Sequence, residues 1–222
     1  MKIAGKIAIF AAGLSVIAAA IWFDACRSHA VEAHGKLGST LEYRVAALDT
    51  EHFDQFNRAP DGFDVFSSTQ ARQIADSGQA PAGFKWMPVS RFYLMETGGG
   101  VEPRGILHTI SGHKFLLVAD RPEMALTHSA DTPAWGVQSV KFTSTNRFGR
   151  PVYMLEVELD GTGGRLVKQF TQKYLRHSVA VIVDGRVVID LGLLGPMGKV
   201  QGFNYPEGGE AIANELREAL LK

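Results

Sequence analysis

The sequence of 222 residues is poor in cysteine and has no excess of charge of either sign. Its single cysteine, Cys26, cannot form an internal disulfide, so the chain is not a domain built on a disulfide framework. Lysine and arginine together number 23, as do aspartate and glutamate, so the chain lacks the basic excess typical of nucleic-acid-binding proteins. The hydrophobic content of 45% suffices to bury one good core, and we therefore expect one principal domain.

Motifs of catalysis and of metal or cofactor binding are also scarce. The pairs His29/His34 and His108/His113 have a spacing that does not place both histidines on one helix face, as two metal ligands would require. The glycine-rich stretch DGTGGRL has Leu166 where a dinucleotide fingerprint needs its third glycine, and no Gly-x-Ser-x-Gly or Cys-x-x-Cys occurs. The sequence predicts no catalytic residue, no metal and no cofactor, and leaves open a metal site assembled from distant residues.

Residues 1–24 carry the one long apolar run of the chain. Ile7 to Phe23 contains no charge, and Lys2 and Lys6 precede it. At roughly 1.5 Å per helical residue this segment just reaches across a hydrocarbon core of roughly 30 Å. Basic residues before an apolar span keep the start of the chain in the cytoplasm. The sequence therefore predicts a single-pass inner-membrane anchor with the remaining chain outside the cytoplasm, that is, in the periplasm.

Two alternatives to an uncleaved anchor stay open. The small residues of Ser28-His29-Ala30 could mark the cleavage site of a signal peptide, although the apolar run is long for one. The other alternative is lipid attachment at Cys26, and Asp24 argues against it. The anchor and the cleaved signal both export the domain. We divide the chain into the anchor or signal segment 1–24, a polar linker 25–39 and an extracytoplasmic domain 40–222.

The first half of the domain shows separate strand and helix signals. Leu41, Tyr43 and Val45 alternate within 40–48 and predict a strand. A short helix is expected after Ser68 or Thr69, with Gly78 ending it. Further expected elements are a strand over 91–97 and a hairpin made of 106–110 and 115–118, joined by Ser111-Gly112.

The pattern of the second half predicts two strands, a helix, two strands and a helix. Residues 137–145 and 151–159 alternate around the turn NRFGR, and 161–177 has Leu166, Phe170 and Tyr174 at helical spacing. Asp184-Gly185 suits a two-residue turn between strands in 179–195, and 206–222 ends in an amphipathic helix. We place Asp184 and Asp190 on this hairpin as exposed residues. The order predicts an α+β fold: an antiparallel sheet with helices on one face.

Several motifs of this half occur in the same order in a known family. They are the leader LLVADRP, the strand pair NRFGRPVYMLEVELD, the helix start DGTGGRLVKQFT, the hairpin VAVIVDGRVV, the strand VQGF and the closing EAIANELREAL. Together they resemble the head subdomain of the first periplasmic domain of SecD, from the SecDF protein-export complex. The resemblance covers 40–222, is best over 113–222, and leaves residues 49–100 without a clear counterpart.

The resemblance implies a non-catalytic, membrane-tethered module that assists or derives from protein export and contacts polypeptide. Translocase subunits or an unfolded client are the partners it implies. SecD itself has several membrane-spanning helices, so proton-driven work cannot be carried over. The alternative function is a structural or assembly domain of the cell envelope with a partner other than the translocase.

The apolar loop after the predicted hairpin is the candidate polypeptide-contact site. It runs from Leu191 to Lys199 with the sequence LGLLGPMGK. Exposed apolar patches usually mark interaction sites, whereas the competing interpretation is that these side chains pack under the last helix. The candidate contact residues are Leu191, Leu193, Leu194, Pro196 and Met197.

Overall fold

The computed structural model of the chain describes most of the predicted extracytoplasmic domain. It describes residues 31–34, 41–50, 62–91, 93, 105–147, 150–205 and 210–220. None of the helices in these ranges is long and apolar enough to span a bilayer. The predicted anchor, Ile7 to Phe23, lies outside the described residues.

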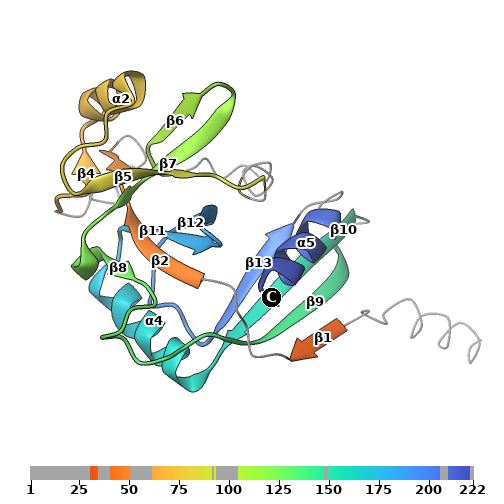
Figure 1. Ribbon diagram of the computed structural model, residues 1–222. Helices are drawn as coiled ribbons and strands as arrows, with labels where there is room; N and C mark the ends of the chain where they lie inside the picture. The colour runs from red at the N-terminus through yellow and green to blue at the C-terminus, as the bar shows by residue number, and fades with distance from the viewer. Residues whose placement is uncertain are drawn as a thin grey trace, which may run out of the picture.

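One sheet has four antiparallel strands in the order β1-β9-β10-β13. A long hairpin forms its centre, and helix α5 packs on the two hairpin strands (Figure 1). Strand β1 lies within the predicted linker 25–39 and pairs with β9 from Val31↔Phe142 to His34↔Ser139. The elements are β1 (Val31–His34), β9 (Val137–Arg147), β10 (Arg150–Leu159), β13 (Val200–Tyr205) and α5 (Glu210–Leu220).

A second, seven-stranded sheet follows the order β12-β11-β2-β7-β5, with β6 paired to β7 and β8 paired to β2. Its end strands meet, because Val89 bridges to Val187 and Ser90 N donates to Val187 O at 2.8 Å. The sheet therefore curls back on itself. Its strands are β2 (Leu41–Ala46), β5 (Phe84–Pro88), β6 (Leu107–Ile110), β7 (His113–Ala119), β8 (Ala125–Leu126), β11 (Ser178–Val183) and β12 (Arg186–Gly192).

Smaller elements surround these sheets. Strands β3 (Leu48–Asp49) and β4 (Val65–Phe66) form a parallel pair, and α2 (Ser68–Ser77) follows it. The cap of α2 is Ser67, one residue before the predicted cap, and Gly78 ends the helix in the left-handed conformation as expected. A 3-10 turn, η3 (Pro122–Met124), precedes β8.

Local sequence explains the elements that hold the candidate site. Asp184 and Gly185 adopt φ values of 49° and 73°, which is the twist that a two-residue turn between β11 and β12 needs. Helix α4 (Gly161–Lys173) begins at Asp160, whose carboxylate accepts from Gly163 N at 2.6 Å. It buries Val167 and Thr171, and the adjacent turn buries Tyr174.

The main core lies between the two sheets and under α4 and α5. Tyr43 and Val45 of β2, Leu155 of β10 and Leu216 of α5 belong to this cluster. A second cluster lies on the opposite face of the curled sheet, where Ala46, Val118 and Ile182 pack with Tyr93 and their neighbours. Because β11 is buried on both faces, all six of its residues are buried.

The α+β class and the antiparallel pairing are confirmed, as are the three predicted hairpins and the three helices predicted within residues 40–222. The expectation of one sheet with helices on one face is wrong. The hairpin β9–β10 and the hairpin β11–β12 belong to different sheets, and β13 joins the first of them. Hairpin pairing is a local property, whereas the next neighbour in a sheet is chosen by contacts far apart in sequence.

The strand expected over 91–97 falls mostly outside the described residues. Arg91 and Tyr93 are described, and neither lies in a strand. The chain leaves β5 at Ser90, where it pairs with β12, and Tyr93 then packs into the second cluster. Tyr93, one of the residues that suggested a strand, is thus a buried core side chain.

Candidate functional site

The loop after β12 divides its apolar side chains between the core and the solvent. Leu193 is only 3% exposed and belongs to the main core, whereas its neighbour Leu194 is 88% exposed. Leu191 and Met197 are partly buried against the core, and Pro196 is exposed. Of the five candidate contact residues, only Leu194 and Pro196 therefore present an exposed side chain.

Backbone hydrogen bonds fix the loop against the end of α4. Arg176 N donates to Leu193 O at 2.7 Å, and Leu193 N donates to His177 O at 2.9 Å. Farther along, Met197 N donates to the Thr171 hydroxyl at 2.8 Å. Thr171 is fully buried, so this bond ties the loop to the inner side of the helix. These hydrogen bonds fix the backbone of the loop, and the side chain of Leu194 points from it into the solvent.

The loop leads into β13, which is the last strand of its sheet. Lys199 O accepts from Leu159 N at 2.9 Å, so the antiparallel register turns the backbone groups of the odd-numbered residues toward β10. The N–H and C=O groups of the even-numbered residues point away from β10. Among the described residues, no strand pairs with this outer edge. The outward residues are Val200, Gly202 and Asn204.

The side chains at this edge leave space for another chain. Gln201 and Phe203 point into the core, and Val200 and Gly202 lie on the opposite, exposed face. A Cβ on Gly202 would meet only the Met154 sulfur, at 3.8 Å. Lys199 is paired with Glu158 at 2.7 Å between Nζ and Oε1. An edge with free backbone groups and little side-chain cover is a template for strand addition.

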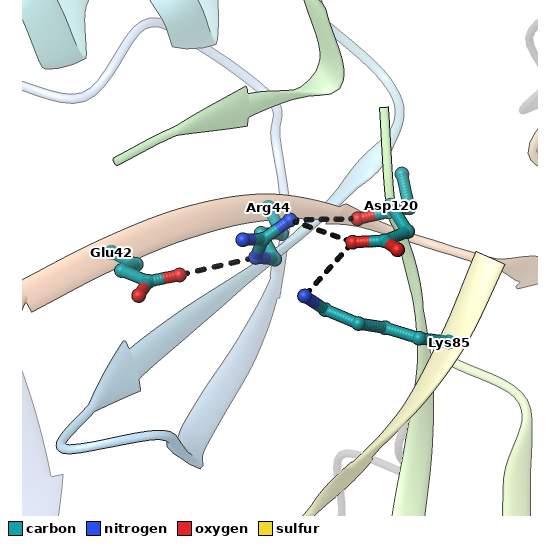
Figure 2. Close-up of polar contacts among 5 residues, drawn as sticks. Glu42, Arg44, Lys85 and Asp120 are labelled. Atoms are coloured by element: carbon teal, nitrogen blue, oxygen red, sulfur yellow. Dashed lines mark hydrogen bonds and ion pairs between the residues drawn. The ribbon is translucent and has the colours of Figure 1, made fainter. Parts of the chain in front are cut away.

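Four charged side chains form one group on the curled sheet: Glu42 and Arg44 come from β2, Lys85 from β5, and Asp120 directly follows β7 (Figure 2). Arg44 lies between Glu42, at 3.1 Å, and Asp120, at 3.7 Å, and Lys85 contacts Asp120 at 2.9 Å. The hydrogen bond from Lys85 is the largest effect on the pKa of Asp120 and lowers it; burial opposes this, and the positive charges of Lys85 and Arg44 lower the pKa further. Two cations balance two anions here, so the group acts as a clamp between β2, β5 and β7.

A second polar contact joins segments far apart in the chain. The carboxylate of Asp64 lies 2.7 Å from Nδ1 of His177, and the Asp64 side chain is only 1% exposed. The ring of His177 packs edge-on against Tyr174. A carboxylate that orients an imidazole ring can support a general base. The backbone of His177 has a structural role as well, because its carbonyl oxygen accepts the hydrogen bond from Leu193 N. The contact thus connects the residues before α2 with the candidate loop.

Metal ligands do not gather in the part of the chain that the structure describes, and an open hollow of about 400 Å³ lies along α2, where Phe66, Ile74 and Pro81 are among its lining residues. Among the described residues, no group of three or more His, Cys, Asp or Glu side chains is placed to hold a metal ion. A cavity of about 10 Å³ lies among Tyr43, Gln201 and apolar side chains of both sheets and α5. This volume is enough for about one water molecule.

The predicted exposure of the two hairpin aspartates differs from their placement. Asp184 is exposed in the turn, as expected. Asp190 is partly buried, and its Oδ2 accepts from Gly105 N at 2.9 Å. The sequence has no signal for this bond, because Gly105 is 85 residues away.

Sequence reasoning missed the edge of β13, the charged clamp and the Asp64–His177 contact. All three depend on which strands and loops become neighbours in space. Comparison of the chain with protein-family models, with curated proteins and with solved structures finds no match.

Proposed function

We propose that this protein is a membrane-tethered, extracytoplasmic binding module that resembles the SecD periplasmic head and contacts polypeptide in an extended conformation. The proposal gives it a place at the inner membrane, with the domain in the periplasm and no catalytic role. The apolar segment Ile7 to Phe23 and the ordered motifs of the second half support it. Translocase subunits or an unfolded client are the partners that follow from this resemblance.

The observation that carries the proposal is the open edge of β13. Extended polypeptide binds such an edge by adding a strand, and main-chain hydrogen bonds then supply the affinity whatever the sequence of the client. The outward groups of Val200 and Gly202 are available for this pairing. Leu194 and Pro196 stand exposed in the loop that precedes the strand and offer apolar contact to the same client. Low sequence specificity is what a module for varied polypeptides requires.

The experiment compares two substitutions of Gly202. Proline removes the outward N–H without breaking the ladder to β10, and proline is tolerated at strand edges that face solvent. Alanine keeps the N–H and meets only the Met154 sulfur. With a fluorescent ten-residue peptide of alternating apolar residues, we expect Gly202→Ala to bind like the native chain and Gly202→Pro to bind at least about tenfold more weakly, as loss of one or more hydrogen bonds implies.

A second measurement keeps this test independent of folding. The same peptide with N-methyl groups on alternate backbone nitrogens cannot form the strand pairing, so we expect it to lose binding to the native chain. Equal binding by the methylated peptide, or by a Gly202→Pro variant that melts like Gly202→Ala, would exclude strand addition at β13.

The alternative function is that of a structural or assembly domain of the cell envelope, which binds a partner other than the translocase. It uses the same fold and differs only in what binds. Purification of the tethered protein from membranes separates the two, because the proposed function predicts translocase subunits or unfolded clients among the partners. A single folded envelope protein recovered in fixed proportion would favour the alternative.

A further inference from the structure

The solvent face of α4 is strongly basic in a chain whose net charge is zero. From Gly161 to His177 the sequence contains no aspartate or glutamate. Arg165 and Lys168 are three residues apart and share one face of the helix, opposite the buried Val167 and Thr171. Arg176 follows at the C-terminal end and is also exposed. The basic residues of this segment are Arg165, Lys168, Lys173 and Arg176.

These charges are mostly not used inside the fold. Lys173 donates to Glu123 O at 3.3 Å and lies 5.0 Å from the ring of Tyr174. Within the described parts of the chain, no carboxylate forms an ion pair with Arg165, Lys168 or Arg176. Three positive side chains along one exposed surface thus remain available to an external anion.

An exposed apolar side chain lies beside this basic face. Leu194 directly follows Leu193, whose carbonyl accepts from Arg176 N at 2.7 Å. The exposed Leu194 is therefore fixed next to the C-terminal end of the helix and not on a freely moving loop. We use the name basic face for Arg165, Lys168, Arg176 and the adjoining Leu194.

The backbone at Arg176 adds an independent observation. Its φ of 73° is in the left-handed region, where glycine is the ordinary residue because a Cβ is disfavoured there. Arginine at this position keeps the positive charge at a conformational cost. Residues held in such conformations often cluster at functional sites, so the outlier points to a use for the arginine side chain.

We propose that the basic face docks on a bilayer of anionic phospholipids, with Leu194 entering the headgroup region. Lipid phosphates form a flat and diffuse field of negative charge, which matches exposed cations spread along a helix better than a single deep ligand would. Basic residues attract a protein to anionic lipids, and an apolar side chain that enters the headgroup region adds buried apolar area to this attraction. Docking would hold the domain close to the membrane and fix its orientation, which a tether alone does not do.

The test uses the full chain in lipid nanodiscs. Cys26 is the only cysteine, so Cys26→Ser allows one environment-sensitive fluorophore to be placed at Leu194→Cys. We expect the emission to shift to the blue, with quenching by nitroxide-labelled lipids, in discs of mixed phosphatidylcholine and phosphatidylglycerol. In phosphatidylcholine alone, or at about 1 M salt where the Debye length is about 3 Å, the shift should disappear.

Charge variants measure how much the basic residues contribute to docking. Each basic residue near an anionic surface changes the ratio of docked to undocked molecules about fivefold, so Arg165→Gln/Lys168→Gln should lower it about 25-fold. Arg176→Gly should lower it about fivefold while keeping the backbone conformation. The matched control is Lys114→Gln/Arg186→Gln, two exposed strand residues close to the turns of their hairpins, which should dock like the native chain. A fluorophore at Lys114→Cys should show no shift, because the β6–β7 hairpin lies at the opposite end of the molecule from α4 (Figure 1).

The outcomes separate this inference from the proposed function, with which it shares only the membrane tether. Peptide binding by Arg165→Gln/Lys168→Gln should equal that of the native chain. If the chain is not anchored, flotation with vesicles of the same two compositions measures docking instead. Three results would overturn the proposal. The first is that the probe is not buried in anionic bilayers, and the second is that it is buried equally in both lipid compositions. The third is that soluble polyglutamate saturates the basic face while anionic lipid has no effect.

Discussion

Adjacent leucines in the candidate loop have opposite environments, and this decides what each contributes. Leu193 packs in the main core and Leu194 is almost fully exposed. We expect Leu193→Ser to lower the free energy of unfolding by about 2–5 kcal/mol, because it removes buried apolar contacts and leaves a hydroxyl in the core. Leu194→Ser should change it by less than about 0.5 kcal/mol. Urea unfolding of both variants checks this, and equal effects would mean that the loop packs differently.

A single backbone angle gives a second test at the residue scale. Arg176 has a φ of 73°, and its N–H already donates to Leu193 O. Glycine adopts this conformation without the steric cost of a Cβ and keeps the N–H, so Arg176→Gly should unfold at the same or a higher temperature than the native chain. Arg176→Ala is the matched control, since it removes the charge but keeps the Cβ. A glycine variant that melts below the alanine variant would show that a Cβ carries no steric cost at this position, and two variants that both melt below the native chain would show that the arginine side chain stabilises the fold.

The elements that the sequence predicts best are those with local signals. The Asp184-Gly185 hairpin, the Ser111-Gly112 hairpin and the helix that starts at Asp160 all follow from turn residues, caps and periodicity. Burial within the apolar loop was not predictable in this way. Leu193 and Leu194 are the same residue type in adjacent positions, and only the pairing of Leu193 with Arg176 and His177 distinguishes them.

Two glycines of α4 illustrate how a helix meets its neighbour. A Cβ on Gly164 would lie 2.9 Å from Lys199 Cβ and 3.1 Å from Lys199 Cα, whereas a Cβ on Gly161 would meet nothing within 4 Å. Gly164→Ala should therefore cost about 1–3 kcal/mol by forcing the loop away from the helix. Gly161→Ala should be neutral or stabilise by up to about 1 kcal/mol through helix propensity. Thermal unfolding of the pair measures the difference, and a Gly164→Ala variant as stable as Gly161→Ala would contradict the close approach.

The charged clamp makes a prediction about acid stability. The pKa of Asp120 is lowered in the folded state, so its contribution is present above the ordinary aspartate value of about 4 and is lost as the pH falls through the lowered folded-state value. Asp120→Asn should melt below the native chain at neutral pH, and the gap should close below about pH 4. The effect is small because the Asp120 side chain is 51% exposed. A gap that stays constant down to acid pH would exclude an electrostatic origin.

At the scale of the whole molecule, the partition into two sheets is what the sequence leaves undetermined. Consecutive hairpins in the second half enter different sheets, and β2, from the start of the domain, lies beside β11 from near its end. Such pairings depend on the total packing of both clusters rather than on any local pattern. The open edge of β13 also depends on this partition into sheets. The outer edge of β13 is unpaired because no described strand follows β13 in its sheet.

The two clusters each bury a tyrosine, which allows the whole fold to be tested at alkaline pH. Burial raises the pKa of Tyr43 despite its hydrogen bond to Gln201, and burial followed by the nearby Asp190 raises the pKa of Tyr93. Below about pH 10 both tyrosines are protonated in the folded and the unfolded chain, so their full contribution to stability is present. Above that pH only the unfolded chain releases these protons, and stability should fall by roughly 1.4 kcal/mol per pH unit for each tyrosine.

Phenylalanine variants assign this alkaline loss to the two clusters. Tyr43→Phe and Tyr93→Phe should each remove one tyrosine's share of the slope of unfolding free energy against pH. Tyr43→Phe should also cost about 1–3 kcal/mol at neutral pH, because it leaves the buried Gln201 carbonyl oxygen without its donor. If either variant keeps the native slope, the tyrosine it replaces is open to solvent in the folded protein. The corresponding cluster, between the sheets for Tyr43 or inside the curled sheet for Tyr93, would then not be closed.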